Sequence, residues 1–99
     1  VSTPEFAAAQ KAFDRGVRAA RKQLPIHKKR SLMTTAVRCK FLQNKHLWKI
    51  LDSTGDRILI EHTKRDSLWG DGGTGMDTPT NNLLGKVLMD VRSELRKFS

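Results

Sequence analysis

Carboxylates, a tryptophan and several glycines gather in one short stretch of the sequence, EHTKRDSLWGDGGTG at residues 61–75. Glu61, Asp66 and Asp71 could supply the carboxylates, and Trp69 lies between two of them. An aromatic face can stack on a sugar or a base, and a carboxylate can activate water or stabilise an oxocarbenium-like transition state. Glycines let the backbone approach a ligand closely. Composition alone favours a simpler interpretation, an Asp/Gly-rich turn with Trp69 tucked into the core.

The familiar sequence motifs for metals and cofactors are missing. The spacing of Asp66, Asp71 and Asp77 does not follow the alternating ligands of an EF-hand, and no glutamate closes that loop. The glycines match neither a phosphate loop nor a dinucleotide fingerprint. Cys39 is the sole cysteine, which excludes an internal disulfide. The histidines are scattered, and each is interpreted as a surface or capping side chain: His27, His46 and His62. We therefore expect no metal and no cofactor.

The elements that must position these residues are mostly helical. Apolar spacing and capping signals predict four helices. We expect them to run from Thr3-Pro4-Glu5 to Leu24-Pro25, from about His27 to Leu42, from about Leu47 to a stop at Thr54-Gly55, and from a cap at Thr80 or Asn81 to Phe98.

The segment Arg57–Glu61 is the only convincing strand, because its β-branched and apolar residues are bounded by Gly55 and a polar stretch. Residues 62–80 lack any periodicity, and so long a loop in a small domain is often functional. One strand cannot make a sheet, so either further strands are missed or the partner strands belong to sequence absent here.

The net charge of +9, from 19 Lys+Arg against 10 Asp+Glu, favours anionic partners such as nucleic acid, nucleotides or phosphorylated metabolites. Residues 11–49 hold 12 basic side chains and a single acid, Asp14, although a solvated helical surface explains most of them equally well. No apolar run approaches the ~20 residues of a membrane span. A lone cysteine and no visible signal peptide favour a cytoplasmic or nuclear protein. The absence of an initial methionine is consistent with a chain cut from a longer one.

Lys40 lies in an apolar helical stretch, AVRCKFLQN. A lysine in such a place usually extends its ammonium group to solvent. Less often it is desolvated, loses its proton readily and attacks a carbonyl carbon. Both interpretations stay open from the residues alone.

Short patterns keep their order and approximate spacing over about residues 29–97. They are KF.QN at Lys40 to Asn44, L..TG at Leu51 to Gly55, L.E at Leu59 to Glu61, D..WG.G at Asp66 to Gly72, and N.LGK.LM.VR at Asn82 to Arg92. Together they resemble the C-terminal two-thirds of the NADAR (YbiA-like) domain family. The resemblance implies a mainly helical α+β domain with a small sheet, of which residues 1–99 form the C-terminal portion. The family's N-terminal strands, and a glutamate in an EHY.Q stretch, have no counterpart here. We therefore expect a complementary N-terminal segment or a second chain as a partner.

The same resemblance implies an N-glycosidase, an enzyme that cleaves the bond between a ribose carbon and a nitrogen. Two substrate classes are known in the family: ADP-ribose attached to guanine bases of nucleic acid, and phosphorylated intermediates of riboflavin biosynthesis. The charge of +9 suits ADP-ribosylated DNA or RNA somewhat better, because phosphate contacts reward spread positive charge. Two non-catalytic alternatives remain, a basic nucleic-acid-binding domain and an ADP-ribose-binding module.

Residue roles follow from the resemblance. Lys40 would attack the opened sugar and form a Schiff base, while Asp71 or Asp66 would transfer protons or stabilise the cationic sugar. Glu61 would orient these groups or accept ribose hydroxyls. The other predicted contacts hold substrate in the loop or at the start of the last helix, where an N-terminus favours anions: Trp69, Gly70, Asn82, Gly85 and Lys86.

Overall fold

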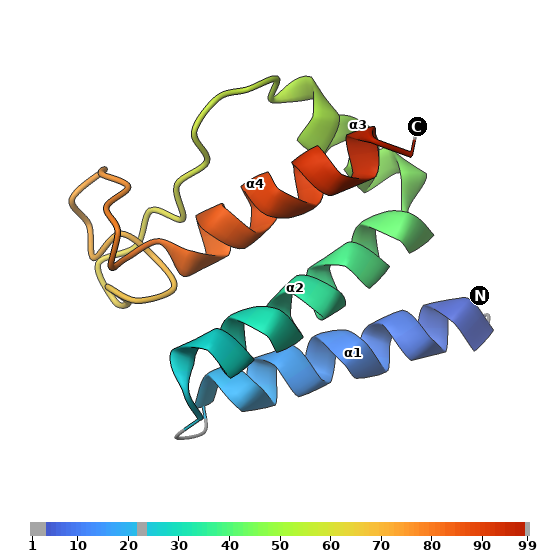
Figure 1. The fold of residues 1–99 in the computed structure, drawn as a ribbon, viewed down its shortest axis with the longest axis horizontal. Helices are drawn as coiled ribbons and strands as arrows, with labels where there is room; N and C mark the ends of the chain where they lie inside the picture. Colours follow the sequence, from blue (N-terminus) through green and yellow to red (C-terminus); the bar gives the residue numbers. More distant parts are fainter. Residues whose placement is uncertain (1–3, 22–23, 99) are drawn as a thin grey trace. The chain divides into compact units, whose positions relative to one another are not determined.

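The structure, a computed structural model, describes residues 4–21 and 24–98, and these residues form four helices (Figure 1). The helices are α1 (Pro4–Arg21), α2 (Ile26–Gln43), α3 (Lys45–Ser53) and α4 (Leu83–Arg96). The chain divides into two compact units, Val1–Ser53 and Thr54–Ser99. The first unit holds α1 to α3, and the second holds a long loop followed by α4. The predicted cap at Thr3 lies outside the described residues, and a single domain over residues 1–99 stays a prediction.

The first unit is a helical hairpin extended by a short third helix. Helices α1 and α2 lie side by side (Figure 1). Pro25 precedes α2 with φ of −54° and ψ of 142°, an extended conformation from which the helix begins. Ala12 and Ala36 are buried, and such small side chains let two helices approach closely. The predicted second helix is confirmed and is one residue longer at each end.

The third helix is also confirmed. Helix α2 ends at Asn44, whose side-chain amide donates to the carbonyl of Lys40 at 2.9 Å. Helix α3 starts directly after it and stops before Gly55, which has φ of 63°. A left-handed residue at this position is the usual way to end a helix, and glycine adopts it without strain. The stop expected at Thr54-Gly55 is therefore where the sequence placed it.

The predicted strand at residues 57–61 is wrong, because residues 54–82 contain neither a strand nor a helix. The β-branched residues are present, but among the described residues no second strand pairs with them. The side chain of Asn82 binds the segment instead: its Nδ2 donates to the carbonyl of Leu59, and its Oδ1 accepts the N–H of Glu61, both at 2.9 Å. A single side chain cannot extend into a ladder. The described residues are therefore helical with one long loop, and the expected small sheet receives no support from them.

The last helix is confirmed, but its predicted cap is wrong. Asn82, rather than Thr80 or Asn81, precedes α4, and it has the left-handed φ of 53° and ψ of 39°. Its side chain makes no capping bond, because it is engaged with the 59–61 segment. Asn81 instead stabilises the turn before the helix, because its Oδ1 accepts the N–H of Thr78 at 2.7 Å.

Helix α4 holds both ends of the long loop. Apolar side chains four residues apart are buried along one face of the helix: Leu83, Val87, Val91 and Leu95. Near its C-terminus, Nη1 of buried Arg92 donates to Oγ1 of Thr54 at 2.8 Å. Arg96 donates to the carbonyl of Gly55 at 2.9 Å and to the carboxylate of Asp56 at 3.1 Å. The start of the loop thus rests on the last turns of α4, whereas its end leads into the first turn.

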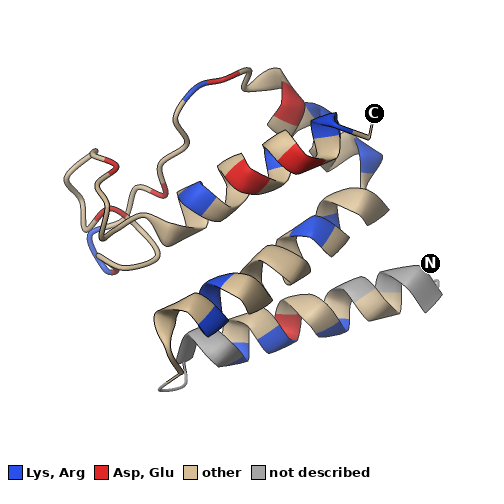
Figure 2. Ribbon diagram, viewed as in Figure 1, with Lys and Arg blue, Asp and Glu red and all other residues tan. Residues whose placement is uncertain are grey.

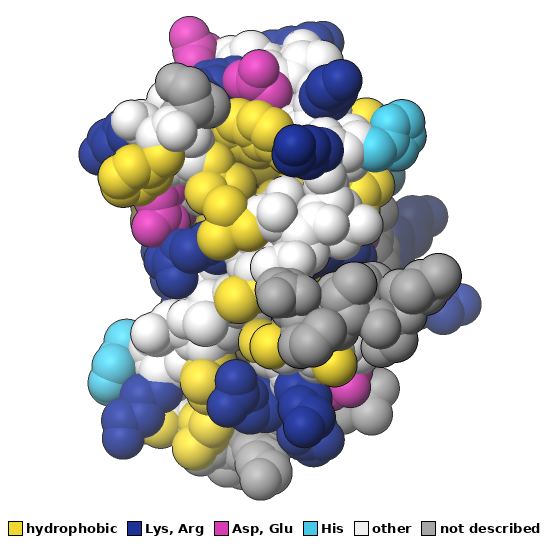
Figure 3. Space-filling model, turned by 90° about the vertical axis from the view of Figure 1, so that its right-hand side faces the viewer, with side chains coloured by type: hydrophobic (Ala, Val, Ile, Leu, Met, Phe, Trp, Pro, Cys, Tyr) yellow, Lys and Arg dark blue, Asp and Glu magenta, His cyan; other side chains and the backbone are white. Residues whose placement is uncertain are grey.

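The two units differ in charge. Residues 1–53 carry 12 Lys+Arg against 3 Asp+Glu, whereas residues 54–99 carry 7 of each, so the first unit accounts for the whole net charge. Figure 2 shows basic positions along α1 and α2, and acidic positions mainly in the loop, α3 and α4. In the space-filling view, lysine and arginine side chains are scattered over the face shown and do not gather in one patch (Figure 3). None of the described helices has the length and apolar character that a membrane crossing requires.

Candidate functional site

The first half of the candidate loop is a turn built around Asp66. Its Oδ1 accepts the N–H groups of Leu68 and Trp69, both at 2.8 Å, and its carbonyl accepts the N–H of Gly72 at 3.0 Å. An aspartate that binds N–H groups two and three residues further on stabilises a tight turn. Trp69 is thereby held half-buried, with an Nε1–H that has no partner within the described residues. Asp66 therefore positions the aromatic ring of the loop.

The second half of the loop folds around the carboxylate of Asp71, which is buried. Oδ1 accepts the N–H groups of Thr63 at 2.9 Å and Gly73 at 2.7 Å. Oδ2 accepts the N–H of Gly75 at 2.7 Å and lies 2.6 Å from Nδ1 of His62. Four groups from both sides of the loop thus meet at one carboxylate. Asp71 joins the two sides of the loop.

These contacts decide the charge of Asp71. Burial by itself would raise the pKa of the carboxyl group, but hydrogen bonds from His62 and from the N–H groups of Gly73, Thr63 and Gly75 outweigh it. The pKa of Asp71 is therefore well below its ordinary value of 3.8. The group stays ionised at neutral pH and keeps no proton to donate. Its assignment as the catalytic acid stays a prediction, while its geometry is that of a positioning residue.

His62 is the functional candidate that the sequence did not reveal. Its side chain is 66% exposed although its partner, the carboxylate of Asp71, is fully buried. An ionised carboxylate at Nδ1 fixes the proton on that nitrogen, and Nε2 is then left as the basic atom. The two residues are nine positions apart, and no local pattern marks them as a pair. Only the contact between the two sides of the loop brings them together.

The junction between the loop and α4 is made by the side chain of Asn82, which is 0% exposed. Besides its bonds to Leu59 and Glu61, its Nδ2 donates to Oδ1 of Asp77 at 3.0 Å. Binding the carbonyl of one residue and the N–H two residues later is what one residue of a parallel strand does in a sheet. Asn82, predicted to bind substrate, has its donors and its acceptor occupied by the protein.

The first turn of α4 is capped by the loop itself. The N–H groups of Asn82, Leu83 and Leu84 donate to the carbonyls of Gly70, Leu68 and Trp69, at 2.8, 2.9 and 3.0 Å respectively. These are the orphan donors that would otherwise attract an anion at a helix N-terminus. These three N–H groups, which were expected to bind an anion at the start of the last helix, therefore already donate to carbonyls of the loop.

Close approach explains the two glycines that were predicted to contact substrate. A Cβ on Gly70 would lie 2.8 Å from the carbonyl oxygen of Asp66 and 2.9 Å from that of Glu61. A Cβ on Gly85 would overlap the carbonyl oxygen of Leu59 and lie 2.5 Å from both terminal atoms of Asn82. Both glycines are required by the packing of the loop against its own backbone.

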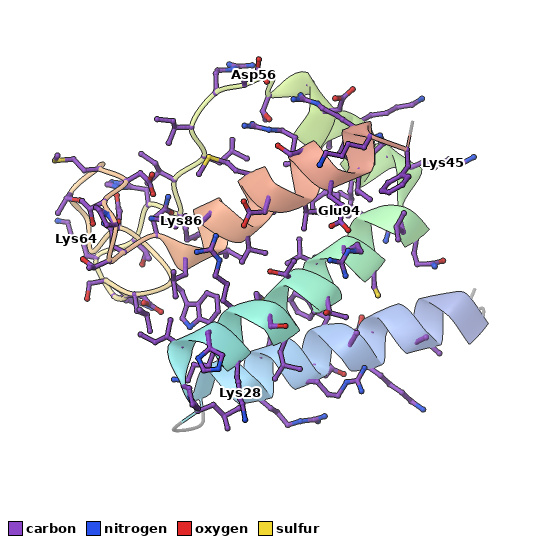
Figure 4. The ribbon with its side chains drawn as sticks, in the orientation of Figure 1. Lys28, Lys45, Asp56, Lys64, Lys86 and Glu94 are labelled. Carbon is purple, nitrogen blue, oxygen red and sulfur yellow. The ribbon has the colours of Figure 1, made fainter. Side chains whose placement is uncertain are left out.

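Lys86 reaches from α4 to the loop that precedes it (Figure 4). Its Nζ donates to Oδ1 of Asp77 at 2.7 Å and to the carbonyls of Thr78 and Asn81 at 2.5 and 2.6 Å. An ammonium group has three N–H donors, and these contacts occupy all of them. The pKa of Asp77 is lowered, first by the hydrogen bond from Lys86 and then by that from Asn82. Lys86 thus closes the end of the loop, and its predicted contact with substrate stays untested.

Lys40 lies in the first unit, on α2. It is exposed, and its Nζ lies 4.9 Å from the centre of the Phe13 ring, a cation–π arrangement. The interpretation of an ammonium group that extends to solvent matches this geometry. Its role as a Schiff-base nucleophile stays a prediction.

The structure brings together several of the residues that were predicted to form the site. Asp66, Trp69, Gly70 and Asp71 do converge in one compact loop, and the exposed carboxylate of Glu61 leads into it. Their hydrogen bonds are mostly with other residues of the loop and with the start of α4. Within the described part of the chain, no three His, Cys, Asp or Glu side chains are grouped as a metal site requires.

Comparison with known proteins adds a family and several relatives. The family model described as NADAR domain matches residues 2–96. The chain is 48% identical to the riboflavin biosynthesis protein VVA0006 of Vibrio vulnificus over 68 residues. These residues make up 69% of this chain and 18% of that protein. It is 42% identical over 67 residues to N-glycosidase YbiA of Escherichia coli, covering 68% of this chain and 40% of that protein. It is 40% identical over 70 residues to N-glycosidase Npun_R5314 of Nostoc punctiforme, covering 71% of this chain and 43% of that protein.

The match is therefore to part of each relative. The chain spans less than half the length of the curated N-glycosidases that it resembles. The search of solved structures gave no significant match.

Proposed function

The chain belongs to the NADAR domain family, and on this premise we propose that it carries the catalytic loop of an N-glycosidase that hydrolyses a ribose–nitrogen bond. The observation that carries the proposal is its identity of 40–42% with relatives named N-glycosidases. The loop at residues 61–75 is the part of the chain best suited to this chemistry, because it combines an aromatic ring, carboxylates and a histidine with one nitrogen fixed.

Hydrolysis breaks the bond between C1′ and the nitrogen, adds the hydroxyl of water to C1′, and places a proton on the leaving nitrogen. In the proposed mechanism, His62 moves the proton through Nε2, because Asp71 holds its Nδ1. Trp69, positioned by Asp66, stacks on the sugar or the base. Glu61 accepts ribose hydroxyls or stabilises the positive charge that develops on the sugar.

Lys40 offers a second route within the same proposal. In the ring-opened sugar C1′ is still joined to the base nitrogen as an imine. The amine of Lys40 adds to C1′, the base leaves with its nitrogen protonated as the Schiff base forms, and one water then hydrolyses the Schiff base to release the sugar and the free amine. Borohydride reduces such an imine to a stable adduct. A mass increase on the wild-type chain equal to the sugar less one oxygen (water lost on condensation, two hydrogens gained on reduction), absent in Lys40→Arg, supports this route, and no adduct in either chain excludes it.

We propose ADP-ribose on guanine bases of DNA or RNA as the substrate, because the first unit carries the entire net charge of +9. The similarity to a protein named for riboflavin biosynthesis favours a second candidate, the phosphorylated aminouracil ribosides of that pathway. A cytoplasmic or nuclear place of action, and a complementary segment that completes the site, belong to the same proposal.

The test is incubation of the chain with each substrate, followed by detection of the released base and sugar. Trp69→Phe, which keeps an aromatic ring, and Trp69→Ala, which removes it, are compared with Trp48→Ala, a change to the other half-buried tryptophan. Release that falls with the size of the ring at position 69, and not at position 48, supports the proposal.

The binding alternatives predict a different result. NMR shifts of the loop amides on addition of ADP-ribose, without release of the base, would favour an ADP-ribose-binding module. Binding of unmodified DNA that weakens steeply with salt, with no shift at the loop, would favour a basic nucleic-acid-binding domain. No release and no loop shifts would overturn the proposed function.

A further inference from the structure

Asp71 is the one aspartate or asparagine of the sequence that is followed by glycine. In such a pair the backbone nitrogen of the glycine can attack Cγ of the aspartate. The N–Cγ bond closes a five-membered succinimide, while the amide proton and a carboxyl hydroxyl leave as water. Another water opens the ring, either back to aspartate or to isoaspartate. Glycine permits this attack readily, because it has no side chain to obstruct the approach.

The loop requires the glycine that makes this pair reactive. Gly72 has φ of 65°, and a Cβ at this position would lie 3.1 Å from Cβ of Ser67. A residue with a side chain would be strained in this conformation. The reactive pair is therefore part of the fold, and any restraint on the reaction must come from the contacts around it.

The first restraint acts on the attacking nitrogen. The N–H of Gly72 donates to the carbonyl of Asp66 at 3.0 Å. The nitrogen must give up this proton and turn toward Cγ of Asp71 before it can attack. Both changes break the hydrogen bond that closes the Asp66 turn.

The second restraint acts on the carboxyl group of Asp71, which is buried. Four contacts fix its orientation, from Nδ1 of His62 and from the N–H groups of Thr63, Gly73 and Gly75. Turning Cγ toward the nitrogen of Gly72 breaks contacts on both oxygens. The reaction also uses the neutral carboxyl group, from which a hydroxyl can leave, whereas these contacts keep the pKa of Asp71 below its ordinary value.

Isoaspartate at position 71 would remove the fixed partner of His62. The former side chain becomes part of the backbone, which is then one carbon longer, and the free carboxylate is attached directly to Cα. A longer backbone with a shorter side chain does not match the present contacts to residues 61–63 and 73–75. The modification would therefore dismantle the loop at its most buried carboxylate.

We propose that Asp71–Gly72 is a modification site, the place where this chain forms isoaspartate, and that the closed loop suppresses the reaction. The proposal does not depend on the glycosidase activity, because it concerns the chemistry of one peptide bond. Reaction proceeds from the fraction of molecules in which the loop is open. Of the four donors to Asp71, three are backbone N–H groups, so the 66% exposed side chain of His62 is the contact that a substitution can remove.

Ageing of the chain in warm, neutral buffer tests the suppression, with isoaspartate located by peptide mapping. The wild type is compared in buffer and in concentrated urea. We expect isoaspartate at position 71 to form at least about 10-fold more slowly in buffer, because the open fraction is small there. Asp52, which is followed by Ser53 in α3, is the internal control, since serine also permits the reaction.

Substitution of His62 tests the contribution of its contact. His62→Ala should form isoaspartate at position 71 about 3–10-fold faster than the wild type, with formation at Asp52 unchanged. His62→Asn keeps an amide donor for Asp71 and should stay near the wild-type rate. His46→Ala, at another exposed histidine, is the matched control and should not alter the rate.

Several results would overturn the proposal. Equal rates in buffer and in urea would show that the loop gives no protection. A dominant isoaspartate at another residue in urea would show that Asp71–Gly72 is not the modification site. A His62→Ala rate equal to that of the wild type, or an equal acceleration at Asp52 and Asp71, would remove His62 from the restraint.

Discussion

Nδ1 of His62 lies 2.6 Å from Oδ2 of Asp71, and this contact joins a side chain that is 66% exposed to one that is fully buried. The carboxylate also accepts three backbone N–H groups, so its position is determined by the loop rather than by the histidine. A fixed anion orients an imidazole and stabilises it when it takes up a proton. The pair is therefore the part of the loop most suited to proton transfer.

His62→Asn should separate the two roles of the histidine. The amide nitrogen of asparagine can replace Nδ1 as a donor to Asp71, but nothing replaces Nε2. We expect the loop to keep its fold and the release of base to fall by about 10²–10⁴-fold, the usual contribution of a general acid or base. His46→Asn, another exposed histidine, is the control and should retain full activity. Undiminished release by His62→Asn would remove His62 from the mechanism.

Acid should weaken the fold through Asp71. Its carboxyl group has an ordinary pKa of 3.8 when unfolded and a lower pKa when folded, so the unfolded chain binds the proton more tightly. The stabilisation is complete above about pH 5 and is lost as the pH falls through 3.8 toward the folded pKa. Urea unfolding at successive pH values should show this decline.

Carboxyl NMR measures the same group directly. The Asp71 signal should titrate below 3.8 in the wild type and closer to that value in His62→Ala, which lacks one of the four donors. Titration of Asp71 at or above 3.8 in the wild type would contradict the hydrogen-bonding pattern described for the loop.

Asn82→Ala should be strongly destabilising. It leaves the N–H of Glu61 and the carbonyl of Leu59 without their partner, and it forces alanine into a left-handed backbone. We expect a loss of about 2–4 kcal/mol in the free energy of unfolding. Asn82→Gly removes the same amide but tolerates the backbone, so its loss should be about 1 kcal/mol smaller. Equal stability of Asn82→Ala and wild type would show that the junction contributes nothing.

Gly85→Ala should reverse the ordinary preference of a helix. Alanine in place of glycine normally stabilises a helix by about 1 kcal/mol. Here the added Cβ meets the carbonyl of Leu59 and the side chain of Asn82, so we expect a net loss of about 1–3 kcal/mol. Ser93→Ala, at an exposed position of the same helix, is the control and should not destabilise. Thermal melting of the two variants gives the comparison.

Lys86→Met distinguishes a structural lysine from one that binds phosphate. If the ammonium group closes the loop, its loss costs about 1–3 kcal/mol of stability and raises the pKa of Asp77 toward its ordinary value. If it binds substrate phosphate, stability is unchanged and KM rises. Urea unfolding, carboxyl NMR and steady-state kinetics on one preparation decide between the two outcomes.

The helices could be predicted from the sequence because their signals are local. Apolar spacing and Gly55 each act within a few residues: the second helix was predicted to within one residue at each end, and the third stops before Gly55 as expected. The strand prediction failed because a strand exists only with a partner. No local pattern in residues 57–61 predicts that the segment binds the side chain of Asn82, which is more than 20 residues away.

In the candidate site, too, local patterns could be predicted from the sequence, whereas contacts between distant residues could not. The patterns D..WG.G and N.LGK mark the loop and its junction with α4, and the structure brings the two together. They did not show that Asp71 is buried beneath four donors, or that Lys86 donates all three of its N–H groups to the loop. Asp71 becomes buried only when residues 61–63 pack against residues 71–75, and the same packing brings His62 to Asp71.

The capping of α4 by the carbonyls of Leu68, Trp69 and Gly70 also has a kinetic consequence. A helix of 14 residues is only marginally stable alone in water, because forming its first hydrogen-bonded turn, at any point along it, is costly. Here the N–H groups of the N-terminal turn find their acceptors only after the loop has closed. Closing the loop requires an entropy loss before these bonds form. We therefore expect the capping bonds of α4 and the closed loop to form together.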